Sequence, residues 1–489
     1  MKAIVLCVSL MNVAHQTFAS VKPKPKKSAS AQHAKPATKP TRKPPSRAAT
    51  SKPKHRPTRS STPDISPERG TAAAESVQAT LAEAPANPFL YSRNLDAFFH
   101  ALAAQQSKTT NPDEPASTIR ILQFGDSHTA ADYYTGAVRE QLQSRFGNGG
   151  LGYQFPGHPF AGYRLAGSSR GQTSGWITDG NHFTHLGDGY VGLGGLSLST
   201  ERPNESVTLS TTCSTLQVQY LRQPKGGHLH FTDNGIFISD IDTAADSSDP
   251  AAPGTRTAGT MTYACTPGVH DFALTTLDHL PVRLLGMVTD QPGITYERLG
   301  INGAYAPLML QWNQDLFAEY LRQRDPNLIV LAYGTNEAAQ SSSHNTDYVY
   351  DFNRLLQNLH RIVPNASILV LGPYDRAMRA GRGRRASWHT FEGTDRIIAD
   401  QKESCRQYHC AFYDQRARQG GPGSAIRWVS AGYGQPDRTH LTGTGYRALA
   451  QAFYLDLLAA YKHYLAEPEP TNQSATHSPR VIHSAERNQ

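Results

Sequence analysis

The chain has 489 residues, of which 38% are hydrophobic and 18% are charged, values that are ordinary for a soluble protein. Its net charge of +8 is unevenly placed: residues 1–70 carry 15 Lys and Arg against 2 Asp and Glu, which leaves residues 71–489 with a net charge of −5. Because a body that binds nucleic acid presents a basic face, this mildly acidic body excludes nucleic acid as its partner.

The first residues have the pattern of an export signal. Lys2 precedes an apolar run over residues 3–14, and Thr17 and Ala19 are small residues of the kind found before a cleavage site. We expect a signal peptide over residues 1–19 and a periplasmic or secreted protein, with an uncleaved signal anchor as the alternative. No later apolar stretch reaches the roughly 18 residues that a membrane helix needs, so we expect no transmembrane segment in the mature chain.

Residues 20–87 are expected to form a disordered, basic linker rich in Pro and Lys. Within it, residues 21–70 have few large aliphatic side chains and bury too little apolar surface to offset the entropy of ordering. The charge of the linker suits electrostatic contact with anionic polymers of the cell envelope, and a solubilising spacer is an equal alternative. The polar residues 467–489 are expected to be a flexible tail.

Four cysteines remain after the predicted signal peptide, an even number that suits two disulfides in an oxidising compartment. Four cysteines permit three connectivities. We expect the pairs Cys213–Cys265 and Cys405–Cys410, because each pair lies within one predicted segment.

From about residue 88 the chain has the alternation of an α/β fold. Residues 118–124, 327–333 and 366–371 are short apolar runs that each end in glycine, as buried parallel strands do. Helical patterns separate these runs, so a parallel sheet flanked by helices is predicted. The predicted helices are residues 131–146, 307–322, 351–362 and 446–465.

A β-rich segment interrupts this alternation over residues 161–290. It is rich in Gly, Thr, Ser and Asp, and it contains short strand-like runs such as 216–221 and 282–288 with turn residues between them. We expect an inserted all-β domain, sandwich-like and with carbohydrate binding as a candidate role. The insertion divides the α/β domain into residues 88–160 and 291–466.

Ser127 and His440 are candidates for nucleophilic catalysis. Ser127 follows the first strand in the run Gly-Asp-Ser-His, at the carboxyl edge of the sheet where α/β proteins bind ligands. Asp437 and His440 stand three residues apart, so the carboxylate can bond one imidazole nitrogen and leave the other to accept the serine proton. Taken singly, each cluster also fits an ordinary turn.

Two further clusters offer donors for a developing oxyanion. Gly303 lies in the run Gly-Ile-Asn-Gly-Ala at 300–304, where a glycine lets backbone approach a ligand closely. Asn336 follows the predicted strand 327–333, and its side-chain amide can donate to an oxyanion, an interaction commonly worth several kcal/mol of barrier.

Together and in this order, the four clusters resemble the four sequence blocks of the SGNH hydrolases, serine esterases of the GDSL type. The resemblance covers about residues 115–160 and 291–465 and implies a flavodoxin-like fold. It makes Ser127 the nucleophile and His440 the general base. The remaining roles that it implies are orientation of the base by Asp437 and an oxyanion hole built from the N–H groups of Ser127 and Gly303 and the side chain of Asn336.

One departure from the common pattern points to a narrower group. The family usually has Leu after the nucleophile, where this chain has His128. Gly-Asp-Ser-His-Thr-Ala-Ala-Asp at 125–132, Leu-Gly-Ile-Asn-Gly-Ala at 299–304 and the β-insertion resemble the bacterial peptidoglycan O-acetylesterases. This resemblance implies removal of acetyl from the C6 hydroxyl of muramic acid residues. Separately, we expect no cofactor and no metal.

Other activities fit the same blocks. An acetylesterase or acetyltransferase that acts on an exported polysaccharide such as cellulose would use the same acyl-enzyme. A non-catalytic carbohydrate-binding envelope protein with a vestigial site is a third interpretation.

Several other residues have two interpretations. His128 either supports the turn or touches substrate, and Glu337 is expected to support the loop of Asn336. His228 and His230 share one strand face but have no third ligand nearby, so a metal site is not expected. The basic run 376–385 is expected to be a solvated loop near the rim of the site, with contact to an acidic glycan as the alternative.

Overall fold

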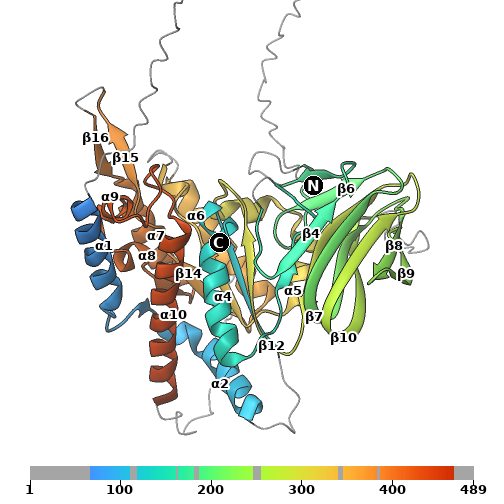
Figure 1. Cartoon of the computed structure of the whole chain (residues 1–489), viewed down its shortest axis with the longest axis horizontal. Coiled ribbons are helices and arrows are strands. Elements are labelled where there is room, and N and C mark those ends of the chain that lie inside the picture. The colour runs from blue at the N-terminus through green and yellow to red at the C-terminus, as the bar shows by residue number, and fades with distance from the viewer. Residues whose placement is uncertain are drawn as a thin grey trace, which may run out of the picture. The chain divides into compact units, whose positions relative to one another are not determined.

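The computed structural model describes residues 67–110, 118–160, 163–180, 187–245, 255–339, 345–382 and 386–466 (Figure 1). They all belong to one compact unit, Thr62–Gln489. The expected signal peptide, the linker up to residue 66 and the expected tail from residue 467 lie outside the described residues. None of the helices in the described ranges combines the length and the apolar character that a membrane crossing requires.

A six-stranded sheet forms the centre of the α/β part, in the order β1-β17-β14-β13-β2-β12. Neighbouring strands from β17 to β12 are parallel, and β1 pairs with β17 in the antiparallel sense. Numbered along the chain, the parallel strands have the order 2-1-3-4-5 of flavodoxin-like folds, which confirms the predicted α/β class. The strands are β1 Phe89–Leu90, β2 Thr118–Gly125, β12 Gly293–Gly300, β13 Leu328–Ala332, β14 Ser367–Leu371 and β17 Ala411–Tyr413.

Alternating side chains of the central strands build two hydrophobic cores. In β13, Leu328 and Val330 join the core beneath α2, α4 and α10, whereas Ile329 and Leu331 join the core beneath η2, α5, α6 and α7. A strand buried on both faces is apolar at every position, which is why its sequence predicts it. The helices are α1 Pro67–Ala82, η1 Ser92–Leu95, α2 Asp96–Thr110, α3 Ser127–Ala130, α4 Tyr133–Phe146, η2 Ala306–Gln311, α5 Gln314–Arg324, η3 Glu337–Ala339, α6 Asn345–Ile362, α7 Gly393–Gln407, α8 Gln415–Arg418, α9 Ser424–Ser430 and α10 Gly443–Ala466.

Two predicted helices differ from the structure. In place of one helix over 307–322, the chain forms η2 and then α5, because the side chain of Asn313 accepts a hydrogen bond from Leu316 N (2.9 Å) and starts a new helix there. The helix predicted over 131–146 begins at Tyr133, after Asp132 adopts the left-handed conformation (φ 53°).

The prediction of a disordered linker over 20–87 is wrong for residues 67–82, which form α1. This helix contacts α9 (Figure 1), and its Val77 is buried. The buried guanidinium of Arg418 closes the C-terminal end of α1 by donating to three backbone carbonyl groups. These tertiary contacts order a segment whose composition resembles a linker. The acceptors are the carbonyl oxygens of Thr80, Leu81 and Glu83.

A nine-stranded antiparallel sheet occupies much of the chain between β2 and β12. Its long strands β7 and β10 pair along most of their length, and the sheet encloses a hydrophobic core of its own. Its first strand, β3, precedes residue 161 and pairs with β11, which ends at Asp290. The strands are β3 Gly152–Gln154, β4 Ser168–Gln172, β5 Ile177–Asp179, β6 Ser197–Thr200, β7 Ser206–Arg222, β8 His228–Asp233, β9 Ile236–Asp242, β10 Thr257–Thr276 and β11 Val282–Asp290.

The antiparallel sheet and the α/β part share buried polar contacts. The Tyr320 hydroxyl on α5 donates to Tyr220 O of β7 (2.7 Å) and accepts from Gly259 N of β10 (3.2 Å). The buried Arg324, also on α5, bonds to Asp290 at the end of β11 and to Glu297 in β12. Buried polar groups that satisfy each other's hydrogen-bonding capacity in this way hold the antiparallel sheet against α5.

One of the two expected disulfides is present. Cys405 and Cys410 are bonded, whereas Cys213 and Cys265 are thiols whose Sγ atoms lie 3.9 Å apart. Cys265 falls where the pairing of β10 with β7 shifts between Ala264 and Gly268, so the two cysteines are close without being directly paired.

Candidate active site

Three strand ends bring three of the four sequence clusters to one edge of the central sheet. Gly125 ends β2 and pairs in register with Gly300 at the end of β12 on one side and with Ala332 at the end of β13 on the other. Ser127, Gly303 and Asn336 follow these ends by two to four residues. The order of the strands reverses between β2 and β13, which is the position where doubly wound folds bind ligands.

Glycine at the strand ends lets the short helix α3 lie directly against the sheet. A Cβ atom on Gly125 would stand 2.0 Å from Thr129 Oγ1, and a Cβ atom on Gly300 would stand 2.4 Å from the backbone nitrogen of Ala130. Any larger residue at either position would push α3 away. The position of Ser127, the first residue of α3, therefore depends on both glycines.

Ser127, His440 and Asp437 form a continuous hydrogen-bonded series. Ser127 Oγ lies 2.8 Å from His440 Nε2, and His440 Nδ1 lies 2.7 Å from Asp437 Oδ2. These distances are those of a nucleophile, a base and an orienting carboxylate. The structure thus brings together the three residues that the first and last clusters supply.

The loop before α10 holds the carboxylate of Asp437 in its ionised form. Partial burial acts to raise the pKa of Asp437, but the hydrogen bond from His440 and those from two backbone N–H groups outweigh burial and lower it. The backbone donors are Thr439 N and His440 N, each 3.0 Å from Oδ1.

Glu337 and Asn336 tie the second and third clusters together. The Glu337 carboxyl accepts hydrogen bonds from Ala306 N (2.8 Å) and Gly334 N (3.0 Å). Asn336 Nδ2 donates to Ala304 O (2.8 Å), next to Gly303. These bonds fix the loop that carries Gly303 against the loop that carries Asn336, and Glu337 supports the loop as its sequence position predicts.

His128 lies buried behind the serine. Its Nδ1 is hydrogen-bonded to Tyr446 Oη of α10 (2.8 Å), and its ring stacks on that of Tyr374 with 4.4 Å between centroids. Burial, together with the nearby His440, lowers the pKa of His128 well below its usual value, so the ring stays neutral. The structural interpretation of His128 therefore fits better than contact with substrate.

Two buried carboxyl groups lie behind the loops of the site. Burial raises the pKa of Asp126 to about 7, and the nearby charge of Glu337 acts in the same direction. Burial likewise raises the pKa of Glu337 to about 7. Asp126 also caps α3, because its Oδ1 accepts from His128 N (2.9 Å).

The other candidate residues do not join this cluster. His228 pairs with Asp278 (2.7 Å) and His230 with Asp240 (2.9 Å), both in the antiparallel sheet. In the basic run 376–385, the described part belongs to a two-stranded hairpin whose strands are β15 Ala377–Ala380 and β16 Ser387–Thr390. The hairpin is bonded to the loop of His440, since Ala377 N donates to Arg438 O (3.0 Å).

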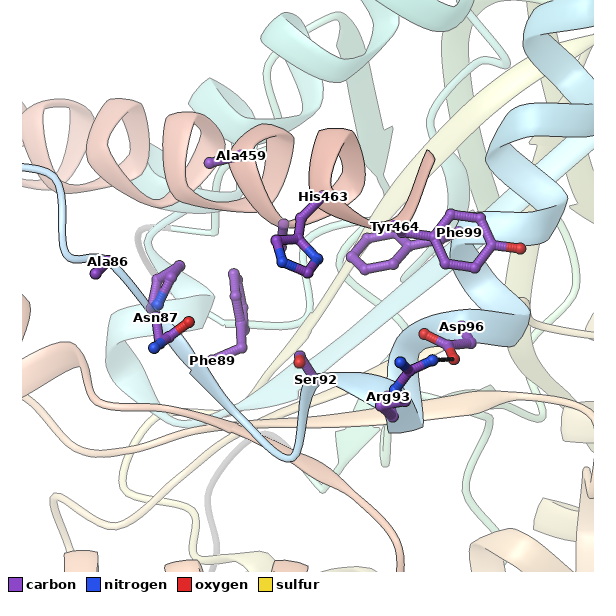
Figure 2. Close-up of a pocket in the computed structure, with 12 residues that line it drawn as sticks. Ala86, Asn87, Phe89, Ser92, Arg93, Asp96, Phe99, Ala459, His463 and Tyr464 are labelled. Atoms are coloured by element: carbon purple, nitrogen blue, oxygen red, sulfur yellow. Dashed lines mark ion pairs between the residues drawn. The ribbon is translucent and has the colours of Figure 1, made fainter. Parts of the chain in front are cut away.

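A separate pocket lies at the far end of α10 (Figure 2). His463 and Tyr464 project from the last turns of this helix toward the segment of Phe89, and Tyr464 lies beside Phe99 with 5.7 Å between ring centroids. Tyr446, which contacts His128, lies 17 residues before His463 on the same helix. This separation corresponds to a rise of about 25 Å along the helix. The pocket is therefore not part of the serine site.

Residues 262–448 match the model of the GDSL-like Lipase/Acylhydrolase family. The chain contains a GDSL-like acylhydrolase domain. The matched range includes the clusters of Gly303, Asn336 and His440. Ser127 precedes this range and reaches the same edge of the acylhydrolase sheet through the pairing of β2 with β12.

A solved structure shares the fold of this chain, and two others match it more weakly. The structure described as "Peptidoglycan O-acetylesterase in action, 5 min" is 23% identical, covers 75% of this chain and 96% of its own, and has a TM-score of 0.62. A family two carbohydrate esterase from Clostridium thermocellum with cellohexaose (11% identity, 58% and 98% coverage) and one from Cellvibrio japonicus (12%, 61% and 99%) have TM-scores of 0.27 and 0.26. A sequence search of curated proteins finds no match.

The matched domain is thus a GDSL-like carboxylic ester hydrolase, as its sequence blocks predict. Its fold resembles that of a peptidoglycan O-acetylesterase. Sequence reasoning does not identify Tyr374 as a support of the site, and it places Arg376 only in a basic run near the rim. Tyr446 stands in the run after His440, and its sequence position predicts only a helix residue. No local pattern indicates these partners, because each reaches the site from a different element.

Proposed function

We propose that this chain is an exported serine esterase that removes O-acetyl groups from a cell-envelope polysaccharide, with peptidoglycan as the favoured substrate. The observation that carries the proposal is the hydrogen-bonded series of Ser127, His440 and Asp437 at the switch point of the sheet. Export is supported by the pattern of residues 1–19 and by the Cys405–Cys410 disulfide.

In the proposed reaction, Ser127 Oγ attacks the acetyl carbonyl carbon while His440 Nε2 takes the hydroxyl proton. The oxyanion that forms is stabilised by the side chain of Asn336 and by backbone N–H groups of Gly303 and Ser127. Ser127 is the first residue of α3, a position whose N–H has no acceptor within the helix. His440 then returns its proton to the sugar oxygen as the ester bond breaks, which leaves an acetyl group on Ser127.

Water completes the proposed cycle. His440 takes a proton from water, the hydroxide oxygen bonds to the acetyl carbon, and Ser127 Oγ leaves with the proton, which releases acetate. The side chains of His440 and Asp437 are 35% and 47% exposed. An open site of this kind admits water as the acceptor, which favours hydrolysis over transfer of acetyl to a second sugar.

The antiparallel sheet is proposed to hold the polymer. Its β8–β9 edge exposes Ile236 and Phe237, at 68% and 55%. The Phe237 ring stacks on that of His230 with 4.8 Å between centroids. An exposed ring held in one orientation offers an apolar face to a sugar ring.

Acetate release tests the proposed function. Wild-type protein should hydrolyse 4-nitrophenyl acetate and should release more acetate from O-acetylated peptidoglycan than from acetylated xylan or acetylated cellulose. Ser127→Ala should lower the rate on each substrate by about a thousandfold or more, because it removes the nucleophile. Ser144→Ala, an exposed serine on α4, is the matched control. Near-normal turnover by Ser127→Ala would show that Ser127 is not the nucleophile.

A further inference from the structure

Three arginines gather at the rim of the site, on and beside the β15–β16 hairpin. Arg376 precedes β15 and donates from Nη1 to Thr335 O (2.8 Å), in the loop of Asn336. Arg379 stands on β15, in register with Trp388 of β16. Arg438 lies between Asp437 and His440, and its guanidinium stacks on the Trp388 ring, 3.8 Å from the centroid.

The stacked guanidinium of Arg438 is held in a fixed place beside the triad. Arg438 has the left-handed conformation (φ 56°), and its Nη1 donates to Pro436 O (2.7 Å). Burial and the neighbouring positive charge of Arg379 lower the pKa of the Arg438 guanidinium. Arg379 and Arg438 carry like charges that repel each other, and an anion that lies between them would relieve the repulsion.

No carboxylate of the described residues forms an ion pair with Arg376, Arg379 or Arg438. The Nε atoms of Arg376 and Arg438 are buried, and within the same described ranges they have no hydrogen-bond partner. Arg376 and Arg438 are half-buried and Arg379 is exposed, whereas several fully buried arginines elsewhere in the described α/β part bond to carboxylates. Examples are Arg139 with Asp132, Arg324 with Asp290, Arg416 with Asp375 and Arg418 with Asp456.

We propose that Arg376, Arg379 and Arg438 form a subsite that binds a carboxylate of the substrate next to the acetyl group that is removed. Guanidinium groups bind carboxylates through paired N–H donors, and the hairpin places these donors around the loops of Asn336 and His440. The proposal rests on the proposed esterase function and extends it: the favoured polymer is acidic, and its charge lies close to the scissile ester.

Peptide carboxylates of peptidoglycan and uronic acids of acidic polysaccharides share this chemistry, so the experiment has two arms. The first compares O-acetylated disaccharide-peptide fragments of peptidoglycan with the same fragments after their carboxylates are converted to amides. The second compares acetylated oligogalacturonate with acetylated cello-oligosaccharide of equal length. Hydrolysis of 4-nitrophenyl acetate is measured in parallel and reports on the esterase itself.

We expect kcat/KM to favour the carboxylate-bearing substrate by about tenfold in at least one arm, the size expected of hydrogen bonds to charged groups. Arg379→Gln should abolish this preference by raising KM, and Arg379→Glu should reverse it. Added salt should weaken the preference of the wild type. Arg361→Gln removes an equal charge from the exposed end of α6 and should leave the preference intact.

The outcomes separate the two proposals. Loss of all hydrolysis, including that of 4-nitrophenyl acetate, would contradict the esterase function. Active enzyme with equal kcat/KM for charged and neutral substrates in both arms would overturn the carboxylate subsite, and so would a preference that survives in Arg379→Glu.

Discussion

The rings of His128 and His440 lie 5.1 Å apart, and the first of them is buried behind the second. His128 is anchored by Tyr446 Oη and stacks on Tyr374. Because the neutral His128 ring adds no charge beside His440, it supports the imidazole without opposing its protonation during the reaction. His128, the residue after the serine, thus forms the buried side of the site against which His440 packs.

Removal of the Tyr446 hydroxyl should destabilise the protein. Tyr446→Phe leaves His128 Nδ1 buried without its partner, and we expect the free energy of unfolding to fall by about 1–3 kcal/mol. Denaturant unfolding measures the change. Tyr350→Phe is the control, since the Tyr350 side chain is 65% exposed. Equal stability of Tyr446→Phe and the wild type would show that the hydrogen bond contributes nothing.

Esterase activity should rise with pH. Only the neutral imidazole of His440 can accept the proton of Ser127, so kcat/KM should increase from about pH 5 to about pH 8. Hydrogen bonds keep the pKa of Asp437 below its usual value, so its titration lies below this range. The pH dependence of 4-nitrophenyl acetate hydrolysis, corrected for the spontaneous rate, measures the effect. A flat profile would contradict the role of His440 as base.

The buried carboxyl of Glu337 should make stability depend on pH. Burial raises its pKa from 4.5 to about 7, so the folded protein holds this proton more tightly than the unfolded chain. Its contribution to stability is complete below about pH 4 and is lost as the pH rises to about 7. Between these pH values, the free energy of unfolding of Glu337→Gln should therefore fall less than that of the wild-type protein.

Denaturant unfolding across that pH range compares Glu337→Gln with the exposed control Glu392→Gln. The control should keep the pH dependence of the wild type. A pH dependence unchanged in Glu337→Gln would mean that Glu337 is ionised in the folded protein throughout.

Cys213 and Cys265 should form a disulfide under oxidising conditions. Their Sγ atoms lie 3.9 Å apart, so a small adjustment of β10 near its shift in register joins them. The bond would stabilise the antiparallel sheet by about 2–4 kcal/mol. Alkylation under denaturing conditions, followed by mass spectrometry, measures the free thiols. Full alkylation of both cysteines in protein recovered from the cell envelope would contradict the prediction.

The exposed ring of Phe237 should contribute to polymer binding. Phe237→Ala removes the apolar face at the β8–β9 edge, and we expect about a threefold or larger loss of affinity, consistent with the contribution of an aromatic contact. Binding of the Ser127→Ala protein to insoluble peptidoglycan, with and without Phe237→Ala, measures this. Leu465→Ala, which removes an exposed apolar side chain from the end of α10, is the control. Unchanged binding of the Phe237→Ala variant would show that the polymer binds at a different surface of the protein.

The α/β class and the four clusters of the site can be recognised in the amino-acid sequence. Strands buried on both faces are continuous apolar runs, and each cluster follows directly after such a strand or before a helix. These features are encoded within a few neighbouring residues. The register of Gly125 with Gly300 then follows from the parallel sheet, which brings the clusters to one edge.

The residues that support the site are brought to it by tertiary contacts and cannot be recognised in the sequence. His128 meets Tyr446 across 318 residues of sequence, and Arg418 closes α1 from more than 330 residues away. Contacts between residues so far apart in the chain leave no periodic pattern in the sequence. From sequence alone, α1 therefore resembles a linker and the β15–β16 hairpin resembles a solvated loop. In the folded chain, packing orders α1 and a hydrogen bond from Ala377 N to Arg438 O holds the hairpin against the loop of His440.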